Sequence, residues 1–156
     1  MKNTRNFHRT IFTAFTALSL LFATNAEAKD IPRDQVPAPV LAAFDKAFAN
    51  AMDVEWNLKG TQYKVEFETG ILFTDHEAWY DASGTLLRHE EEIADSDLPA
   101  AVQASIAKEF AGHKIDDAER ITINGVVSYS VELKGAGTEW DVAYDGKGTQ
   151  LEKKAD

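Results

Sequence analysis

The sequence predicts an α+β protein in which two tandem repeats, each one helix followed by four strands, form an antiparallel sheet with both helices packed on one face. Three observations carry this prediction. An apolar segment that begins Val-Pro or Leu-Pro occurs at 36–48 and again at 98–110, and a Tyr-Asp-x-x-Gly motif occurs at 80–84 and again at 144–148. Segments of alternating polar and apolar residues lie between them. Because each copy must bury the same kind of face, the repeat defines the architecture.

Residues 1–28 have the pattern of a secretory signal peptide. Basic residues precede an apolar run at 11–23, and Ala26-Glu27-Ala28 fits the small-x-small cleavage rule, which predicts a mature start at Lys29. The run is too short to span a bilayer comfortably. The chain contains no cysteine, which excludes a lipidated-cysteine anchor and disulfides. We therefore expect a periplasmic or secreted protein that has no membrane contact after cleavage.

The charge of the chain narrows the classes of partner. Residues 1–28 contain three of the 16 basic residues and one of the 26 acidic residues, so the remainder has a formal charge of −12. A nucleic-acid partner is not expected, since phosphate contacts need clustered Lys and Arg. The acidity is compatible with a cationic partner, with a divalent or trivalent cation, or simply with good solubility.

The first repeat is predicted at 36–93, after a polar lead-in at 29–35. Apolar residues at helical spacing predict a helix over 36–50, with Pro37 in its first turn, where a missing N–H costs nothing. Gly60-Thr61 is a two-residue turn that pairs Leu58 with Tyr63 on one apolar face. A third strand is predicted over about 71–80 and a fourth over about 85–93.

The second repeat is predicted at 94–156. Its helix presents one apolar face and ends at Gly112, and the acidic residues before Pro99 offer capping oxygens. Strands are predicted near 114–123, 126–134, 138–145 and 149–153. Asn124-Gly125 is a strong hairpin signal. We expect a three-residue loop or a bulge there, because a simple two-residue turn would place Ile121 on the opposite face from Tyr129.

The repeated helix motif at 36–48 and 98–110, the alternating strands and the Tyr-Asp-x-x-Gly motif resemble the PepSY-like family of exported bacterial proteins, also described as beta-lactamase-inhibitor-like. The resemblance covers nearly the whole mature chain, and it implies a two-layer inhibitor-like fold in an exported protein without catalytic residues. Its motifs consist of core and turn residues, so they specify the fold better than the function. The second copy departs from the first, since it lacks a tryptophan equivalent to Trp56 and carries Trp140 where the first copy has His76.

His76 and His89 are the candidate metal ligands. If the turn at 81–84 pairs Tyr80 with Thr85, the two histidines lie directly opposite each other on neighbouring strands. Two imidazoles in that position are close enough to share a metal ion. The alternative is a solvated, hydrogen-bonded pair at the rim of the sheet.

Trp79 and carboxylates of the polar sheet face are the candidate partner-binding residues. Alternation places Trp79 on the polar side, where an exposed tryptophan is a typical anchor for a protein partner. The alternative is that a loop or the other repeat covers it. The same register places Glu77 opposite Arg88, and the carboxylates that we expect to contribute are Glu66, Glu68 and Glu77.

Catalytic motifs are missing from the sequence. No serine lies in a glycine elbow, and neither helical His-Glu zinc spacing nor a phosphate-binding glycine loop is present. We therefore expect a non-enzymatic module, without a cofactor, that binds a periplasmic or secreted protein through the open sheet face and acts as its inhibitor or chaperone. The alternative is a periplasmic protein that binds a divalent or trivalent cation on its acidic face.

Overall fold

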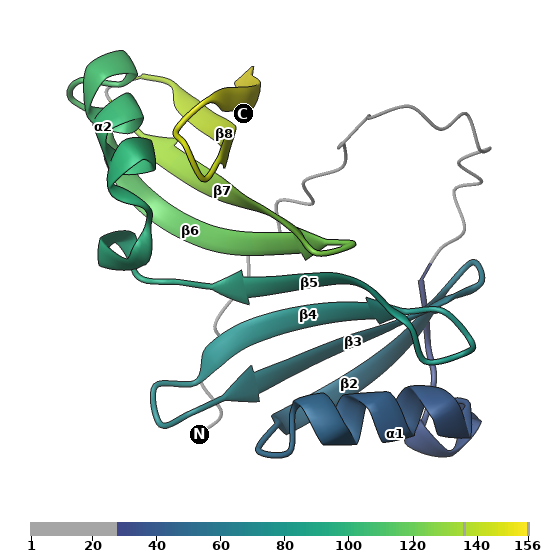
Figure 1. Ribbon diagram of the computed structural model, residues 1–156. Helices are drawn as coiled ribbons and strands as arrows, with labels where there is room; N and C mark the ends of the chain where they lie inside the picture. The colour runs from purple at the N-terminus through teal and green to yellow at the C-terminus, as the bar shows by residue number, and fades with distance from the viewer. Residues whose placement is uncertain (1–27, 136, 156) are drawn as a thin grey trace.

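The computed structural model describes residues 28–135 and 137–155, which form two α-helices and one nine-stranded antiparallel sheet (Figure 1). The strands lie in the sheet in chain order, so each pairs with the next. The predicted α+β class, with one helix followed by four strands in each half, is confirmed, and β1, in the predicted lead-in, adds a ninth strand. The predicted signal peptide, apart from its last residue, lies outside the described residues. Within the described residues, no helix is long and apolar enough to cross a membrane.

The first half contains one helix and the first five strands. Its elements are β1 (Lys29–Asp30), a 3-10 turn (Arg33–Gln35), α1 (Ala38–Ala47), β2 (Met52–Lys59), β3 (Gln62–Thr69), β4 (Thr74–Tyr80) and β5 (Leu86–Glu92). The helix is shorter than predicted because Pro37 and Phe48, which flank it, have non-helical backbone angles. The third predicted strand begins at Thr74 rather than 71, since residues 70–73 form the turn.

The second half repeats the pattern with one helix and four strands. Its elements are a 3-10 turn (Asp95–Asp97), α2 (Ala100–Glu109), β6 (Lys114–Ile123), β7 (Val126–Lys134), β8 (Glu139–Asp145) and β9 (Gln150–Ala155). The predicted capping by the acidic residues before Pro99 is wrong. These residues form the 3-10 turn, and α2 begins after Pro99 without a side-chain cap.

Each half has its own hydrophobic core between its helix and its strands. In the first, Phe44 of α1 makes edge-on contacts with Trp56 and Phe67, with ring centroids 5.2 and 5.1 Å apart. In the second, Val102 and Ile106 of α2 pack on residues of β6, β7 and β8. Both helices therefore cover the same face of the sheet. The halves are joined by five residue pairs between β5 and β6.

The Tyr-Asp-x-x-Gly motif closes the turn after β4 and, again, the turn after β8. The Asp81 carboxylate accepts hydrogen bonds from the backbone N–H groups of Ser83 (2.8 Å) and Thr85 (3.0 Å). The hydrogen bond from the Ser83 hydroxyl, together with these backbone bonds, lowers the pKa of Asp81. Asp145 makes the same kind of bonds in the second half. The motif is thus a turn closed by hydrogen bonds to its own aspartate.

The glycine of this motif lets the turn approach the helix. Gly84 has a φ of 86°, and a Cβ placed on it would lie 2.5 Å from the carbonyl oxygen of Pro39 in the first turn of α1. Gly148 stands in the same relation to Ala101 of α2. The repeated motif therefore fixes each sheet turn against the start of its helix.

The hairpin between β6 and β7 differs from the prediction. Asn124 and Gly125 both have positive φ (50° and 80°) and form a simple two-residue turn that pairs Ile123 with Val126. Such a turn follows the natural twist of the strands, so no extra loop residue is needed. The predicted three-residue loop or bulge at this turn is therefore wrong, and the irregularity in the pairing of β6 with β7 lies between Ile115 and Asp117. As a result Ile123, and Ile121 with it, project from the face opposite the helices.

Candidate functional site: the open face of the sheet

The open face is the side of the sheet opposite α1 and α2, and its side chains form rows that cross the strands. Strand pairing defines a cationic row of Lys64, Trp79 and Arg88, continued by Ile123 and Val126. A middle row follows, made of Glu55, Glu66, Glu77, Glu90 and Ile121. Beyond it an acidic row consists of Glu68, Asp75, Glu92 and Glu119.

Trp79 lies at the centre of the cationic row. The Nζ atom of Lys64 is 5.1 Å from the centroid of its ring, and the guanidinium carbon of Arg88 is 5.2 Å away. The tryptophan is half-buried and on the side of the sheet that alternation predicts. Both cations are within the distance of about 6 Å at which a cation is attracted to an aromatic ring.

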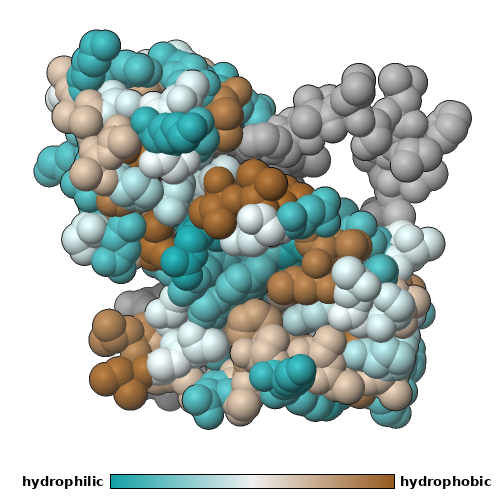
Figure 2. All heavy atoms as spheres, in the orientation of Figure 1, coloured by the Kyte–Doolittle hydropathy of each residue, from teal (hydrophilic) through white to brown (hydrophobic). Residues whose placement is uncertain are grey.

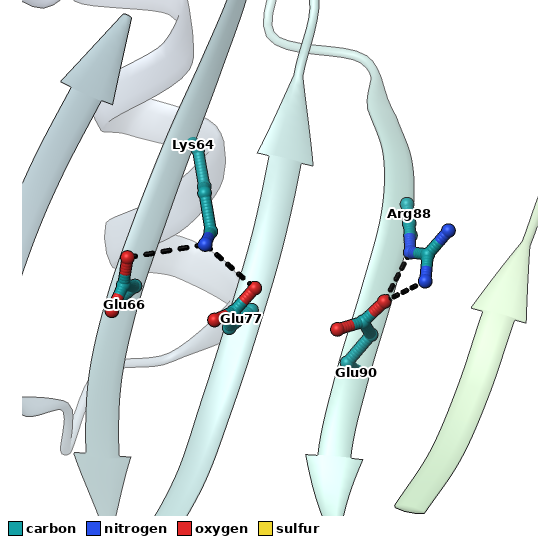
Figure 3. A network of polar contacts seen from close by, with 5 residues as sticks. All are labelled: Lys64, Glu66, Glu77, Arg88 and Glu90. Carbon is teal, nitrogen blue, oxygen red and sulfur yellow. Dashed lines mark hydrogen bonds and ion pairs between the residues drawn. The ribbon is translucent and has the colours of Figure 1, made fainter. Parts of the chain in front are cut away.

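Ion pairs connect the cationic row to the middle row (Figure 3). Lys64, only 7% exposed, contacts Glu66 at 3.1 Å and Glu77 at 2.8 Å, and Arg88 pairs with Glu90 on its own strand. The predicted pairing of Glu77 with Arg88 is wrong, since Glu77 lies opposite Glu90. Tyr80 pairs with Leu86 rather than Thr85, and an irregularity between Trp79 and Tyr80 adds a further residue, so β5 is shifted by two residues from the predicted register. Basic side chains thus compensate much of the charge of the middle row.

The acidic row lacks this compensation. Within residues 28–135 and 137–155, none of its four carboxylates forms an ion pair with Lys or Arg. Burial, with Glu90 and Asp117 nearby, raises the pKa of Glu119 to about 8. Burial and neighbouring carboxylates also raise the pKa values of Glu68 and Glu92. Cationic groups of a partner would stabilise the ionised form of this row.

Part of the open face was not identified from the sequence. Ile121, only 5% exposed, and Ile123 were assigned to the helix side, and Glu119 was not identified as a site residue. The informative signal was the Asn-Gly dipeptide. Read as a plain two-residue turn, it places Ile121, Ile123 and Glu119 on the open face.

The two histidines lie on the opposite, helix-covered face. His76 pairs with Glu91 and His89 pairs with Ala78, so the predicted direct opposition is wrong for the same reason of register. They meet diagonally, with parallel rings and 3.2 Å between Nδ1 of His76 and Nε2 of His89. The Thr69 hydroxyl lies 2.7 Å from the remaining nitrogen of His76. Burial lowers the pKa values of both histidines.

Metal binding by this pair stays a prediction. His76 stacks on Phe67, and His89 lies near Phe48, so aromatic rings form much of the surroundings. Among the described residues, no group of three or more His, Cys, Asp or Glu side chains is placed to hold a metal ion. The pair by itself offers two nitrogen ligands, fewer than the four of a structural zinc site.

Comparisons with known proteins agree with this architecture. The family described as "Putative beta-lactamase-inhibitor-like, PepSY-like" matches residues 22–88 and 61–152. A BLIP-like protein from Bacteroides fragilis has a similar structure, with 22% identity and a TM-score of 0.65, covering 80% of this chain and 87% of that one. A DUF2874 family protein from Bacteroides uniformis gives 20% identity and a TM-score of 0.68, covering 76% and 88%.

A third similar structure is described as a putative periplasmic protein from Bacteroides eggerthii. It is 16% identical, with a TM-score of 0.69, and the match covers 77% of this chain and 88% of that one. At such identities the likeness shows the fold alone. No curated protein matches the chain.

Proposed function

Since the chain belongs to the PepSY-like, beta-lactamase-inhibitor-like family, we propose that it is an exported module that binds a periplasmic or secreted protein through its open face. Membership of this family suggests a non-enzymatic, binding type of module. The signal-peptide pattern of residues 1–28 supports export. Inhibition or chaperoning of the partner is the role that the family description suggests, and this role is part of the proposal.

The observation that carries the proposal is the composition of the face that the helices leave uncovered. A half-buried tryptophan held between two cations lies two rows from a line of carboxylates without basic partners among the described residues. Tryptophan and arginine are enriched where binding energy concentrates in protein interfaces. A partner that fits would place Lys or Arg over the acidic row and an apolar group against Trp79, with Glu66 and Glu77 beside it.

Recovery of partners by wild-type and Trp79→Ala proteins tests the proposal. Each is used as bait in an extract of the cells that naturally produce the protein, and the main recovered protein is then purified and titrated. We expect Trp79→Ala to weaken binding roughly tenfold or more, as for a central interface tryptophan. Lys46→Ala, on the exposed surface of α1, is the control and should leave affinity unchanged. Equal affinity of wild type and Trp79→Ala would refute the proposed anchor.

The acidic row also gives the cation-binding alternative its test. A cation that binds only the native state raises the melting temperature as its concentration increases. Thermal melts with calcium, zinc and a trivalent cation are repeated on Glu119→Gln and on His76→Gln. They show whether the acidic row or the histidine pair binds a cation. A rise in melting temperature that Glu119→Gln abolishes would favour a cation over a protein as the ligand of the open face.

A further inference from the structure

The turn between β3 and β4 exposes three consecutive large apolar side chains, here called the hairpin tip. Ile71 is 93% exposed, Leu72 85% and Phe73 61%. Figure 2 shows apolar atoms protruding at this end of the molecule, where Figure 1 places the β3–β4 turn. The hairpin tip belongs to neither hydrophobic core. Three adjacent exposed side chains of this size mark a contact surface more than scattered single ones do.

The second half of the chain shows that the fold does not need these residues. Its equivalent turn, between β7 and β8, also spans four residues, and its sequence is Gly-Ala-Gly-Thr at 135–138. The same hairpin therefore closes without any large apolar side chain. Phe73 moreover has a φ of 55°, a conformation that bulky residues rarely adopt. Such backbone strain concentrates at functional sites.

The charges at the base of the hairpin tip indicate what it contacts. Glu68 and Asp75 lie opposite each other on β3 and β4, and they are the strand partners nearest the turn on the open face. Asp53 lies close enough to raise the pKa of Glu68. An anionic lipid surface would be repelled by these carboxylates. We propose that the hairpin tip inserts into an apolar pocket with a basic rim on another protein, with Leu72 and Phe73 in the pocket and Glu68 and Asp75 against the rim.

This contact does not depend on the cationic row of the open face. Trp79 lies five residues along β4 from Thr74, about 17 Å at the usual strand rise. A variant of Trp79 and a variant of Leu72 therefore alter different surfaces, so each proposal can fail without the other.

Site-specific photo-crosslinking of the full-length protein tests this inference. p-Benzoylphenylalanine is placed at Leu72, and at Thr138 of the equivalent turn as a matched exposed control, in the cells that naturally produce the protein. We expect a discrete crosslinked protein from position 72 and none from position 138. Absence of a discrete product, or equal products from both positions, would overturn the proposal.

The crosslinked protein is then purified and titrated with defined variants. Leu72→Ser should weaken binding roughly tenfold or more, the loss expected for a fully buried leucine. Glu68→Gln with Asp75→Asn should weaken binding and reduce its sensitivity to salt. Unchanged affinity for Leu72→Ser would overturn the proposal. The proposal would also be overturned if the wild-type protein floated with phosphatidylcholine vesicles and Leu72→Ser did not, because the hairpin tip would then bind lipid rather than protein.

Discussion

Replacing Gly84 by alanine tests whether the sheet turn is fixed against α1. Gly60 and Gly84 are both glycines of the first half with positive φ, 64° and 86°. Nothing lies within 4 Å of a Cβ at Gly60, whereas a Cβ at Gly84 would meet the carbonyl oxygen of Pro39 at 2.5 Å and its carbon at 2.8 Å. Gly60→Ala therefore measures the backbone cost alone, and Gly84→Ala adds the steric cost.

The two costs can be estimated separately. An alanine in left-handed backbone conformation costs about 1–2 kcal/mol, and this cost is common to both variants. At Gly84 the obstacle is backbone, so α1 must move, and its neighbour Val40 is fully buried in the first core. Forcing extra volume into such packing costs about 1–3 kcal/mol. Gly84→Ala should therefore lose about 1–3 kcal/mol more than Gly60→Ala.

Urea denaturation followed by circular dichroism measures both variants under the same conditions. At roughly 4 °C per kcal/mol for a domain of this size, thermal melts should separate them by about 4–12 °C. Gly148→Ala gives an independent repeat, since a Cβ there would meet the Ala101 carbonyl and the Ser105 hydroxyl. Equal losses for Gly60→Ala and Gly84→Ala would show that the turn does not position the helix.

Three further predictions concern pH and the core. Because burial lowers the pKa values of His76 and His89, the folded state favours their neutral forms, so their contribution to stability should be fully present above pH 6.5 and fall as the pH drops below it. The pH dependence of the urea midpoint should weaken in His89→Gln. The raised pKa of Glu119 has the opposite consequence. Its contribution is present below pH 4.5 and is lost as the pH rises through about 8, so Glu119→Gln should gain stability over wild type at pH 9 but not at pH 4. Finally, Phe44→Ala should cost about 3–5 kcal/mol by urea denaturation, because Phe44 is in contact with Trp56 and Phe67, and a loss below about 1 kcal/mol would contradict its central place in the first core.

The sequence predicted the fold well because the repeated residues are those that the fold requires. Val40 and Val102 face the cores, while Gly84 and Gly148 allow the turns to touch the helices. Alternation then assigned most side chains to the correct face, Trp79 among them. These features depend on local periodicity and local turn chemistry, which a single chain displays directly.

Contacts across strands were less predictable because they depend on register. The turn after β4 and the irregularity between Trp79 and Tyr80 together shift β5 by two residues from the predicted register, so Glu77 faces Glu90 and the histidines meet diagonally. Nothing in the residues at 81–85 reveals this shift. The hairpin tip was missed for another reason, since Ile71, Leu72 and Phe73 form an apolar run that resembles the start of a strand.

The histidine pair occupies a position that the second half fills with different residues. Because Leu133 pairs with Trp140 as Phe67 pairs with His76, Trp140 is the equivalent of His76, and Lys153 is likewise the equivalent of His89. Lys153 lies 3.8 Å from the ring centroid of Trp140, so the diagonal contact is retained without imidazoles. The position therefore requires a packed pair, and the ionisable pair is a property of the first half.

The cationic row of the open face is also present in the first half only. The cationic row of Lys64, Trp79 and Arg88 corresponds to Ser130, Ala143 and Glu152 in the second half. The sheet therefore forms equally well without an aromatic ring between two cations. Packing therefore does not require the cationic row, and burying Lys64 almost fully has a desolvation cost. The presence of this row in only one half favours a role in binding over a role in folding. The second half has alanine at the equivalent position. Trp79→Ala should therefore leave the melting temperature within a few degrees of wild type while it lowers the affinity for the partner.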